Sequence, residues 1–280
     1  MPWWEPRDCS PPLPGYTPRE ICSALAGRRL IIIGDSMSRS IYENIIRALA
    51  QGAKQSSLPL SCDQKFNGKF PEGCVGRTLN CSWRGGTGTV LLAHVRSDFL
   101  NFSRTSFAWS DDPNFRESPV HAVFARVMPT HVLLNRGAHF QPDKAYVRGW
   151  EGALDYIARV APRARVLVRN TPAGHPGCGN ATGPLSVPDT VAVWPFHWGD
   201  FPRQNSLLRN LTVRRAGLLY LDVATPTRLR PDMHWSGRDC LHYGYGPGNA
   251  VETWVRLLMG AMGGGGGGVV SLRPPKPRAS

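Results

Sequence analysis

A short apolar run that ends in a small polar turn constrains the fold more than any other part of the sequence. Residues 29–34, RLIIIG, have the continuous apolar character of a strand buried on both faces. Gly34, Asp35 and Ser36 form the turn, and residues 38–50 then place isoleucine and leucine at helical spacing. A buried strand that leads directly into an amphipathic helix is the repeating unit of α/β proteins.

The same alternation continues along the chain. Further strands are predicted over 88–95, 130–137, 164–170 and 218–223, and further helices over 144–160, 201–217 and 251–260. Residues 51–87, with three cysteines, and residues 171–200 have the composition of loops. We therefore expect a three-layer α/β/α sandwich with a mostly parallel sheet and long irregular loops that contain disulfides.

The length of 280 residues suits one large domain. We expect residues 1–27 to be an irregular Pro- and Trp-rich lead-in packed on the domain, residues 28–262 to form the catalytic domain, and residues 263–280 to be a disordered Gly/Pro-rich tail. No run approaches the roughly 20 apolar residues of a membrane span, and the first residues are polar rather than a signal peptide. We expect membrane association only through an N-terminal anchor missing from this sequence.

The formal net charge is +13, carried by 28 Arg and 5 Lys against 20 acidic residues. These basic residues are spread along the chain, whereas nucleic-acid-binding proteins more often concentrate them in a stripe with interleaved aromatic residues. We therefore expect no nucleic-acid partner. A basic surface that attracts an acidic polysaccharide or an anionic donor is an alternative to a simply solvated surface.

The seven cysteines and the glycosylation sequons point to an oxidising compartment. No CxxC pair occurs, which argues against a zinc ribbon or a thioredoxin-like site. Four of the eleven asparagines stand in N-x-S/T sequons. Together these features favour a secreted, disulfide-bonded glycoprotein over a cytosolic protein with buried thiols. The odd cysteine count leaves at least one thiol without a partner in the chain. The sequons are at Asn80, Asn101, Asn180 and Asn210.

Ser36 has two possible roles at the end of the first strand. Asp and Ser are both good helix N-caps, so the turn could simply begin a helix. Alternatively, the turn exposes a nucleophilic hydroxyl beside helix N–H groups that stabilise an oxyanion. The segment is not the G-x-S-x-G elbow of α/β-hydrolases, because Ser38 stands where that motif has glycine. No P-loop sequence follows any strand.

A candidate base and its partner lie near the other end of the sequence. Residues 230–254 contain Asp232, His234, Asp239 and His242. Asp239 and His242 are three residues apart, and on a helical turn this spacing would place the carboxylate where it fixes the imidazole tautomer. The alternative is a surface turn with a capping aspartate.

Asn135 follows another predicted strand. Its amide could donate to an oxyanion or cap the next segment. His139 and His175 are expected to be scaffold or rim residues. No H-x-x-x-H or H-E-x-x-H pattern occurs, so we expect no metal site and no bound cofactor.

Taken in order, the GDS turn, the strand-end asparagine and the D-x-x-H pair resemble the GDSL/SGNH hydrolase superfamily. The segments LAGRRLIIIGDSMSR, LLNRGAHF, RPDMH and DCLH resemble more narrowly the trichome-birefringence-like proteins of the PC-esterase family, which are polysaccharide O-acetyltransferases. The resemblance implies an SGNH-like catalytic domain, with Ser36 as nucleophile, His242 as base and Asp239 as its orienting partner. It implies an oxyanion hole made by the Ser36 N–H and the Asn135 amide. Gly34, Asp35, Arg39 and His234 support these motifs.

The resemblance also implies partners and location. An acetyl donor such as acetyl-CoA or an acetylated carrier would supply the group, and a polysaccharide would accept it, in the Golgi lumen or, alternatively, outside the cell. Gly244 stands where the family has a cysteine, which would leave that cysteine's disulfide partner alone. Two other functions stay open: a carbohydrate esterase with the same triad, and a non-catalytic glycan-binding protein that uses its nine Trp.

Overall fold

A computed structural model describes residues 17–50, 54–58, 73–83, 85–102, 108–109, 116–117, 119–188, 195–245 and 248–263. Most of the expected lead-in, residues 1–16, and most of the expected tail, residues 264–280, lie outside the described residues. Within the described part of the chain, no helix has both the length and the apolar character needed to cross a membrane.

A seven-stranded sheet in the order β2-β3-β4-β1-β7-β8-β9 forms the centre of the molecule. Five neighbouring strands are parallel, and two more extend the β4 edge in antiparallel fashion. The parallel strands are β4 (Gly86–Arg96), β1 (Arg29–Gly34), β7 (His131–Leu134), β8 (Arg165–Arg169) and β9 (Leu218–Leu221). The antiparallel strands are β3 (Cys74–Trp83) and β2 (Lys54–Ser57).

Strand β1 lies between β4 and β7, and its side chains enter both cores. Leu30 and Ile32 belong to one buried cluster, whereas Ile31 and Ile33 belong to the other. A strand that is covered on both faces needs apolar residues at every position, which explains the unbroken run in the sequence. The carboxyl end of this central strand therefore places Gly34 and the following turn at one edge of the sheet.

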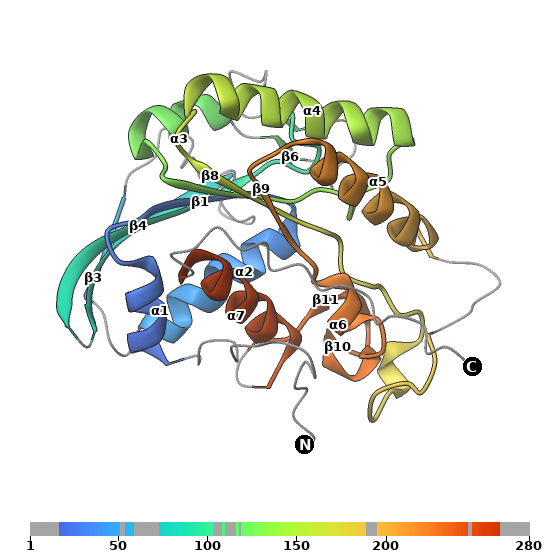
Figure 1. Ribbon diagram of the computed structural model, residues 1–280. Helices are drawn as coiled ribbons and strands as arrows, with labels where there is room; N and C mark the ends of the chain where they lie inside the picture. Colours follow the sequence, from blue (N-terminus) through green and yellow to red (C-terminus); the bar gives the residue numbers. More distant parts are fainter. Residues whose placement is uncertain are drawn as a thin grey trace, which may run out of the picture.

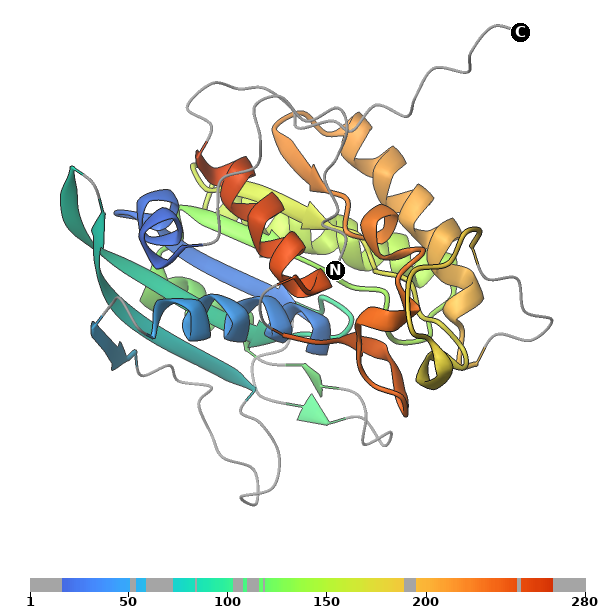
Figure 2. The same cartoon turned by 90° about the horizontal axis from the view of Figure 1, so that it is seen from below.

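Helices cover both faces of the sheet (Figure 1). On one side lie α1 (Pro18–Leu25), α2 (Ser36–Leu49) and α7 (Ala250–Gly263), which Figure 2 shows in front of the sheet. On the other side lie α3 (Val120–Val127), α4 (Asp143–Val160) and α5 (Phe201–Arg214). The predicted three-layer α/β/α sandwich with a mostly parallel sheet is confirmed.

Shorter elements complete the described fold. The helix α6 spans Ala224–Thr227, and single 3₁₀ turns cover Cys178–Asn180, Trp198–Asp200 and Pro231–Met233. Two small antiparallel pairs stand apart from the main sheet: β5 (Ala108–Trp109) with β6 (Arg116–Glu117), and β10 (His234–Ser236) with β11 (Asp239–Tyr243).

Two expectations about irregular segments were wrong. Within the predicted loop 51–87, β3 pairs with β4 over ten residues, because Leu79 and Cys81 turn inward to the core while polar residues alternate with them. Within the predicted lead-in, α1 begins at a capping box in which Thr17 and Glu20 exchange hydrogen bonds. The Cys22–Cys81 disulfide then ties α1 to β3.

Candidate active site

Ser36 is the first residue of α2, directly after the turn that ends β1. Asp35 is the N-cap, and its Oδ1 atom accepts the Met37 N–H at 3.0 Å. Asp35 is therefore the capping residue, which leaves the Ser36 hydroxyl available for chemistry. The Ser36 N–H, at the start of the helix, has no acceptor within the helix.

The turn has no space for a side chain at Gly34. Its φ of +155° is one that L-residues rarely adopt. A Cβ atom there would lie 2.6 Å from both the Asn135 main-chain oxygen and Ser38 Oγ. This close approach explains why glycine precedes the Asp35-Ser36 pair.

Ser36, His242 and Asp239 form a hydrogen-bonded line. The Ser36 Oγ atom lies 2.7 Å from His242 Nε2, and His242 Nδ1 lies 2.8 Å from Asp239 Oδ2. The second carboxylate oxygen of Asp239 accepts the main-chain N–H groups of His242 at 3.0 Å and of Leu241 at 3.2 Å. The structure thus brings Ser36 to His242, which follows it by 206 positions in the sequence, and through His242 to Asp239, in the arrangement of a nucleophile, a base and an orienting acid.

The geometry that joins Asp239 to His242 differs from the one expected. The two residues lie on strand β11 and not on a helical turn. The aspartate instead folds its carboxylate back over the next three residues, as Asp does in turns. The hydrogen bond from the His242 side chain, joined by the main-chain N–H groups, holds the pKa of Asp239 well below its usual range. Asp239 is therefore an anion at neutral pH and favours the Nδ1–H tautomer of His242.

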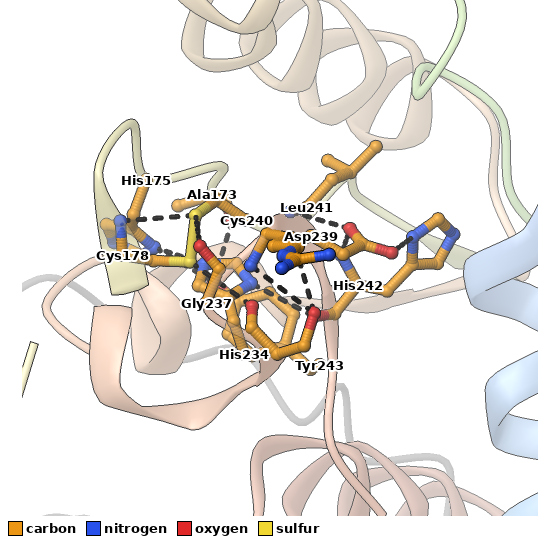
Figure 3. Close-up of a disulfide and its surroundings, with 12 residues drawn as sticks. Ala173, His175, Cys178, His234, Gly237, Asp239, Cys240, Leu241, His242 and Tyr243 are labelled. Carbon is orange, nitrogen blue, oxygen red and sulfur yellow. Dashed lines mark hydrogen bonds and ion pairs between the residues drawn. A yellow bond between two sulfur atoms is a disulfide. The ribbon is translucent and has the colours of Figure 1, made fainter. Parts of the chain in front are cut away.

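A second histidine and a disulfide hold the hairpin that carries this pair (Figure 3). His234 Nδ1 lies 3.0 Å from the His242 main-chain oxygen, and His234 Nε2 lies 2.8 Å from His175 Nδ1. The Cys178–Cys240 disulfide attaches β11 to the loop after β8. Burial lowers the pKa of His234 to about 4, so this residue is neutral near pH 7. His234 and the disulfide thus position His242 through the main chain.

A buried ion pair lies beneath the nucleophile turn. The Arg169 guanidinium is 3.8 Å from Asp35 Oδ1, and both side chains are fully buried. Arg169 also donates to Ser38 Oγ at 3.3 Å and lies over the Trp254 ring at 5.5 Å. Burial lowers the pKa of Arg169 to about 10, which still leaves it cationic. The pair fixes the start of α2 from inside the protein.

Asn135 lies in this same buried layer. Its amide nitrogen is within 3.4–3.5 Å of the main-chain oxygens of Arg169 and Arg136, and its Oδ1 accepts from Ser38 Oγ at 3.3 Å. The side chain is fully buried. These contacts tie the segment after β7 to the end of β8 and to the first turn of α2. The predicted oxyanion role of Asn135 stays a prediction.

The other motif residues have structural partners. Arg39 forms an ion pair with Glu43 at 2.7 Å along α2. Asp232 is paired with Arg230 at 2.8 Å. His139 lies 3.4 Å from the buried carboxylate of Asp98, beside the carboxyl end of β4. Among the residues that the structure describes, no group of three or more His, Cys, Asp and Glu side chains could hold a metal ion.

A comparison of the whole sequence with known proteins found a similar plant protein. The chain is 23% identical over 237 residues to xylan O-acetyltransferase 6 of Oryza sativa subsp. japonica. The resemblance to the polysaccharide O-acetyltransferase family is confirmed. The match covers 82% of this chain but 34% of the rice protein, so this chain spans about a third of the length of that relative. No family model matches the chain.

Three solved structures align with most of this chain at low sequence identity. The periplasmic domain of a lipopolysaccharide acetyltransferase from Salmonella ser. Paratyphi A is 14% identical, with a TM-score of 0.46 over 85% of this chain and 84% of that one. A peptidoglycan O-acetylesterase is 11% identical, with a TM-score of 0.43 over 89% and 96% of the two chains. A "putative GDSL-like lipase" from Parabacteroides merdae ATCC 43184 is 10% identical, with a TM-score of 0.44 over 83% of this chain and 95% of that one.

Sequence reasoning did not identify Arg169 or the Cys178–Cys240 disulfide as part of the site. The signal for Arg169 was a cation directly after the apolar residues 166–168 of the predicted strand 164–170, since a cation buried there requires a counter-charge. Asn170, at the end of the same strand, accepts the N–H groups of Val223 and Ala224 and so joins β8 to the segment after β9. Cysteine positions alone do not specify pairing.

Proposed function

We propose that this protein is a polysaccharide O-acetyltransferase that carries the acetyl group on Ser36. The observation that carries the proposal is the hydrogen-bonded line from Ser36 Oγ through His242 to Asp239, with contacts of 2.7 and 2.8 Å. A histidine that touches both a serine hydroxyl and a carboxylate is poised to remove the serine proton. The similarity to a plant xylan O-acetyltransferase supports acetyl as the group transferred.

The first half-reaction forms the acyl-enzyme. Ser36 Oγ attacks the carbonyl carbon of the acetyl donor while His242 Nε2 takes the hydroxyl proton. The Ser36 N–H, at the positive end of α2, stabilises the developing oxyanion, and Asn135 is the proposed second donor. When the tetrahedral intermediate collapses, the bond to the donor breaks and His242 returns the proton to the leaving group.

The second half-reaction transfers the acetyl group to a glycan. A sugar hydroxyl attacks the Ser36 ester carbonyl and gives its proton to His242 Nε2. Collapse of this intermediate breaks the bond to Ser36 Oγ, which regains the proton from His242, and releases the O-acetylated glycan. Asp239, held as an anion, stabilises the imidazolium that forms in each half-reaction.

A carbohydrate esterase with the same triad is the second candidate function. The observation that favours the esterase is the solvent exposure of His242, the proposed base, and of Asp239, its orienting partner. The side chains of His242 and Asp239 have 28% and 38% of their surface open to solvent. Water therefore reaches the acyl-enzyme unless a bound acceptor excludes it. A non-catalytic glycan-binding role is less well supported, because binding alone would not require this three-residue geometry.

The proposal extends to partners and location. Xylan or a related polysaccharide would be the acceptor, and an acetylated carrier or acetyl-CoA would be the donor. The Cys22–Cys81 and Cys178–Cys240 disulfides are consistent with an oxidising compartment of the secretory pathway. Within that pathway, we propose the Golgi lumen, where the full-length protein would be membrane-anchored. The exposed sequon residues Asn80, Asn180 and Asn210 would be accessible to glycosylation there.

Intact-mass measurement tests the covalent step. The purified protein is mixed with 4-nitrophenyl acetate, and wild type is compared with Ser36→Ala and Asp239→Asn. Wild type should gain one acetyl group that maps to Ser36, or at least turn over the ester. Ser36→Ala should do neither, and Asp239→Asn should slow turnover by about 10⁴-fold, as loss of the orienting acid does in serine proteases.

Product analysis separates transferase from esterase. Xylo-oligosaccharides are added to the reaction, and the acetylated sugar is quantified against free acetate. A majority of acetyl on the sugar supports the transferase, whereas free acetate alone supports the esterase. If wild type and Ser36→Ala behave identically with the ester and the oligosaccharide, neither enzymatic function holds.

A further inference from the structure

The Trp235 side chain is exposed to solvent, unlike the side chains of three other tryptophans in the described part of the chain. Its relative exposure is 66%, whereas Trp150, Trp198 and Trp254 are all at or below 7%. A large aromatic side chain left in water gains nothing for the fold, and aromatic residues on a surface are characteristic of recognition sites. The position of Trp235 therefore decides whether its exposure has a use.

The hairpin register places Trp235 beside the catalytic base. Strand β10 pairs antiparallel with β11, with His234 opposite Tyr243, and the two rings lie 4.2 Å apart on one face of the hairpin. The register shifts after this pair, because the next cross-strand pair is Ser236 with Asp239. Trp235 therefore lies across the hairpin from residues 240–242, the segment that ends in His242, and His242 Nε2 reaches Ser36.

Tyr245 extends this aromatic surface toward the nucleophile helix. Its ring centroid lies 6.2 Å from that of Trp235, at an interplanar angle of 71°. Its hydroxyl donates to Glu43 at 3.1 Å, and the Arg47 guanidinium lies 4.7 Å over its ring. Glu43 and Arg47 both belong to α2, so Tyr245 is fixed against the helix that begins with Ser36.

A serine links Tyr245 to the nucleophile more directly. Ser40 Oγ lies 3.3 Å from the Tyr245 hydroxyl and 3.4 Å from the Ser36 main-chain oxygen. Through Tyr245 and Ser40, the Trp235 ring is thus connected to the first turn of α2. Tyr245 is anchored by several contacts, while the Trp235 ring is open to solvent and to a ligand.

We propose that Trp235, supported by Tyr245, is the stacking platform for the acceptor sugar of the transferase. The proposal rests on the proposed function and names the part of the site that binds the acceptor. A pyranose ring presents an apolar C–H face that packs flat on an indole. A sugar stacked on Trp235 would hold one hydroxyl near His242, and the glycan would displace water from the exposed base. Neighbouring sugars of a chain would extend along the same surface.

Acceptor binding to a non-reacting protein tests the platform. Xylohexaose and cellohexaose are titrated by calorimetry into Ser36→Ala and into Ser36→Ala/Trp235→Ala. The loss of one stacking contact should weaken the affinity about tenfold. Trp235→Phe in the same background should recover most of the affinity. Phe196→Ala is the matched control, since Phe196 is even more exposed, at 88%, and should leave the affinity unchanged.

Steady-state kinetics of proteins that retain Ser36 supply a second measurement. Trp235→Ala should raise the acceptor KM about tenfold with a smaller change in kcat. Equal affinities for Ser36→Ala with and without Trp235, or no binding of either oligosaccharide to Ser36→Ala, would overturn the platform. The proposed function fails separately, through loss of Ser36-dependent ester turnover in wild type.

Discussion

The Arg169 guanidinium lies 3.8 Å from the Asp35 carboxylate, and neither side chain has any exposed surface. This relationship sets the electrostatics of the nucleophile turn, because Asp35 caps α2 from the position next to Ser36. A buried charge is tolerated when its partner is present and is costly when the partner is removed. The pair therefore leads to a prediction about the stability of the protein, which single and double variants of Asp35 and Arg169 can test.

Replacing Arg169 with methionine should lower the free energy of unfolding by about 3–5 kcal/mol, because the Asp35 carboxylate would remain buried without its cation. Urea unfolding followed by circular dichroism measures the change. The double variant Asp35→Asn/Arg169→Met should recover part of the loss, since asparagine still caps the helix and carries no charge. If the double variant lost as much free energy of unfolding as Asp35→Asn and Arg169→Met lose together, the two residues would not be coupled.

Gly34→Ala should destabilise the protein by more than about 2 kcal/mol and remove ester turnover, since the new methyl group would lie 2.6 Å from Asn135 O and Ser38 Oγ. Gly152→Ala is the matched control. Gly152 lies within α4, and apart from its chain neighbours and the adjoining helix backbone no atom of the described residues is within 4 Å of the position that an added methyl group would take, so this change should stabilise by up to about 1 kcal/mol. Thermal unfolding and ester turnover of both variants are the measurements. Normal activity in Gly34→Ala would contradict the tight turn.

The Cys22–Cys81 and Cys178–Cys240 disulfides should have similar effects on stability and different effects on activity. They join residues 59 and 62 positions apart, so removal of either by Cys→Ser pairs should cost about 4 kcal/mol by loop entropy. Cys240 adjoins Asp239, whereas Cys22–Cys81 links α1 to β3. Loss of Cys178–Cys240 should therefore reduce kcat at a temperature where both variants are folded, and loss of Cys22–Cys81 should not. Equal kcat values would exclude a positioning role.

Stability should fall as the pH is lowered from about 6.5 toward 4. Burial holds the pKa of His131 and His234 at about 4 and that of His94 well below its ordinary value. In this window the unfolded chain binds protons that the folded protein excludes, so the free energy of unfolding falls with falling pH. Each histidine contributes at most about 1.4 kcal/mol per pH unit.

Urea unfolding at a series of pH values measures this slope. His131→Gln should reduce the slope by about one proton, because glutamine does not titrate. A slope that is the same in wild type and His131→Gln would mean that His131 titrates alike in the folded and unfolded states.

The layers of the fold follow from local sequence patterns, and the antiparallel edge does not. Five parallel strands and four long helices are marked by apolar runs or helical spacing, since a doubly covered sheet needs such runs. Strand β3 escaped prediction because Gly76, Arg77 and Asn80 interrupt its apolar positions. Its stability comes from pairing with β4 and from the Cys22–Cys81 bond, which are tertiary contacts.

The candidate site was predictable in its members and less so in its geometry. Ser36, Asp239 and His242 were named from motif order, and the structure places them in contact. The predicted helical turn from Asp239 to His242 was wrong, because both residues lie on strand β11. A carboxylate at the start of a strand can also reach a residue three positions later, so the spacing alone does not specify a helix. Arg169 and the burial of Asn135 depend on how several strand ends meet, which no single segment encodes.

The separation of Ser36 from His242 by 206 positions has a consequence for the order in which the protein matures. During synthesis, the Cys22–Cys81 bond can close once residue 81 has emerged, and the nucleophile turn can form on its own strand. His242 and Asp239 emerge much later, on a hairpin secured by Cys178–Cys240. We expect a nascent chain to carry a serine without its base, so that reactivity toward esters begins only when the last hairpin docks.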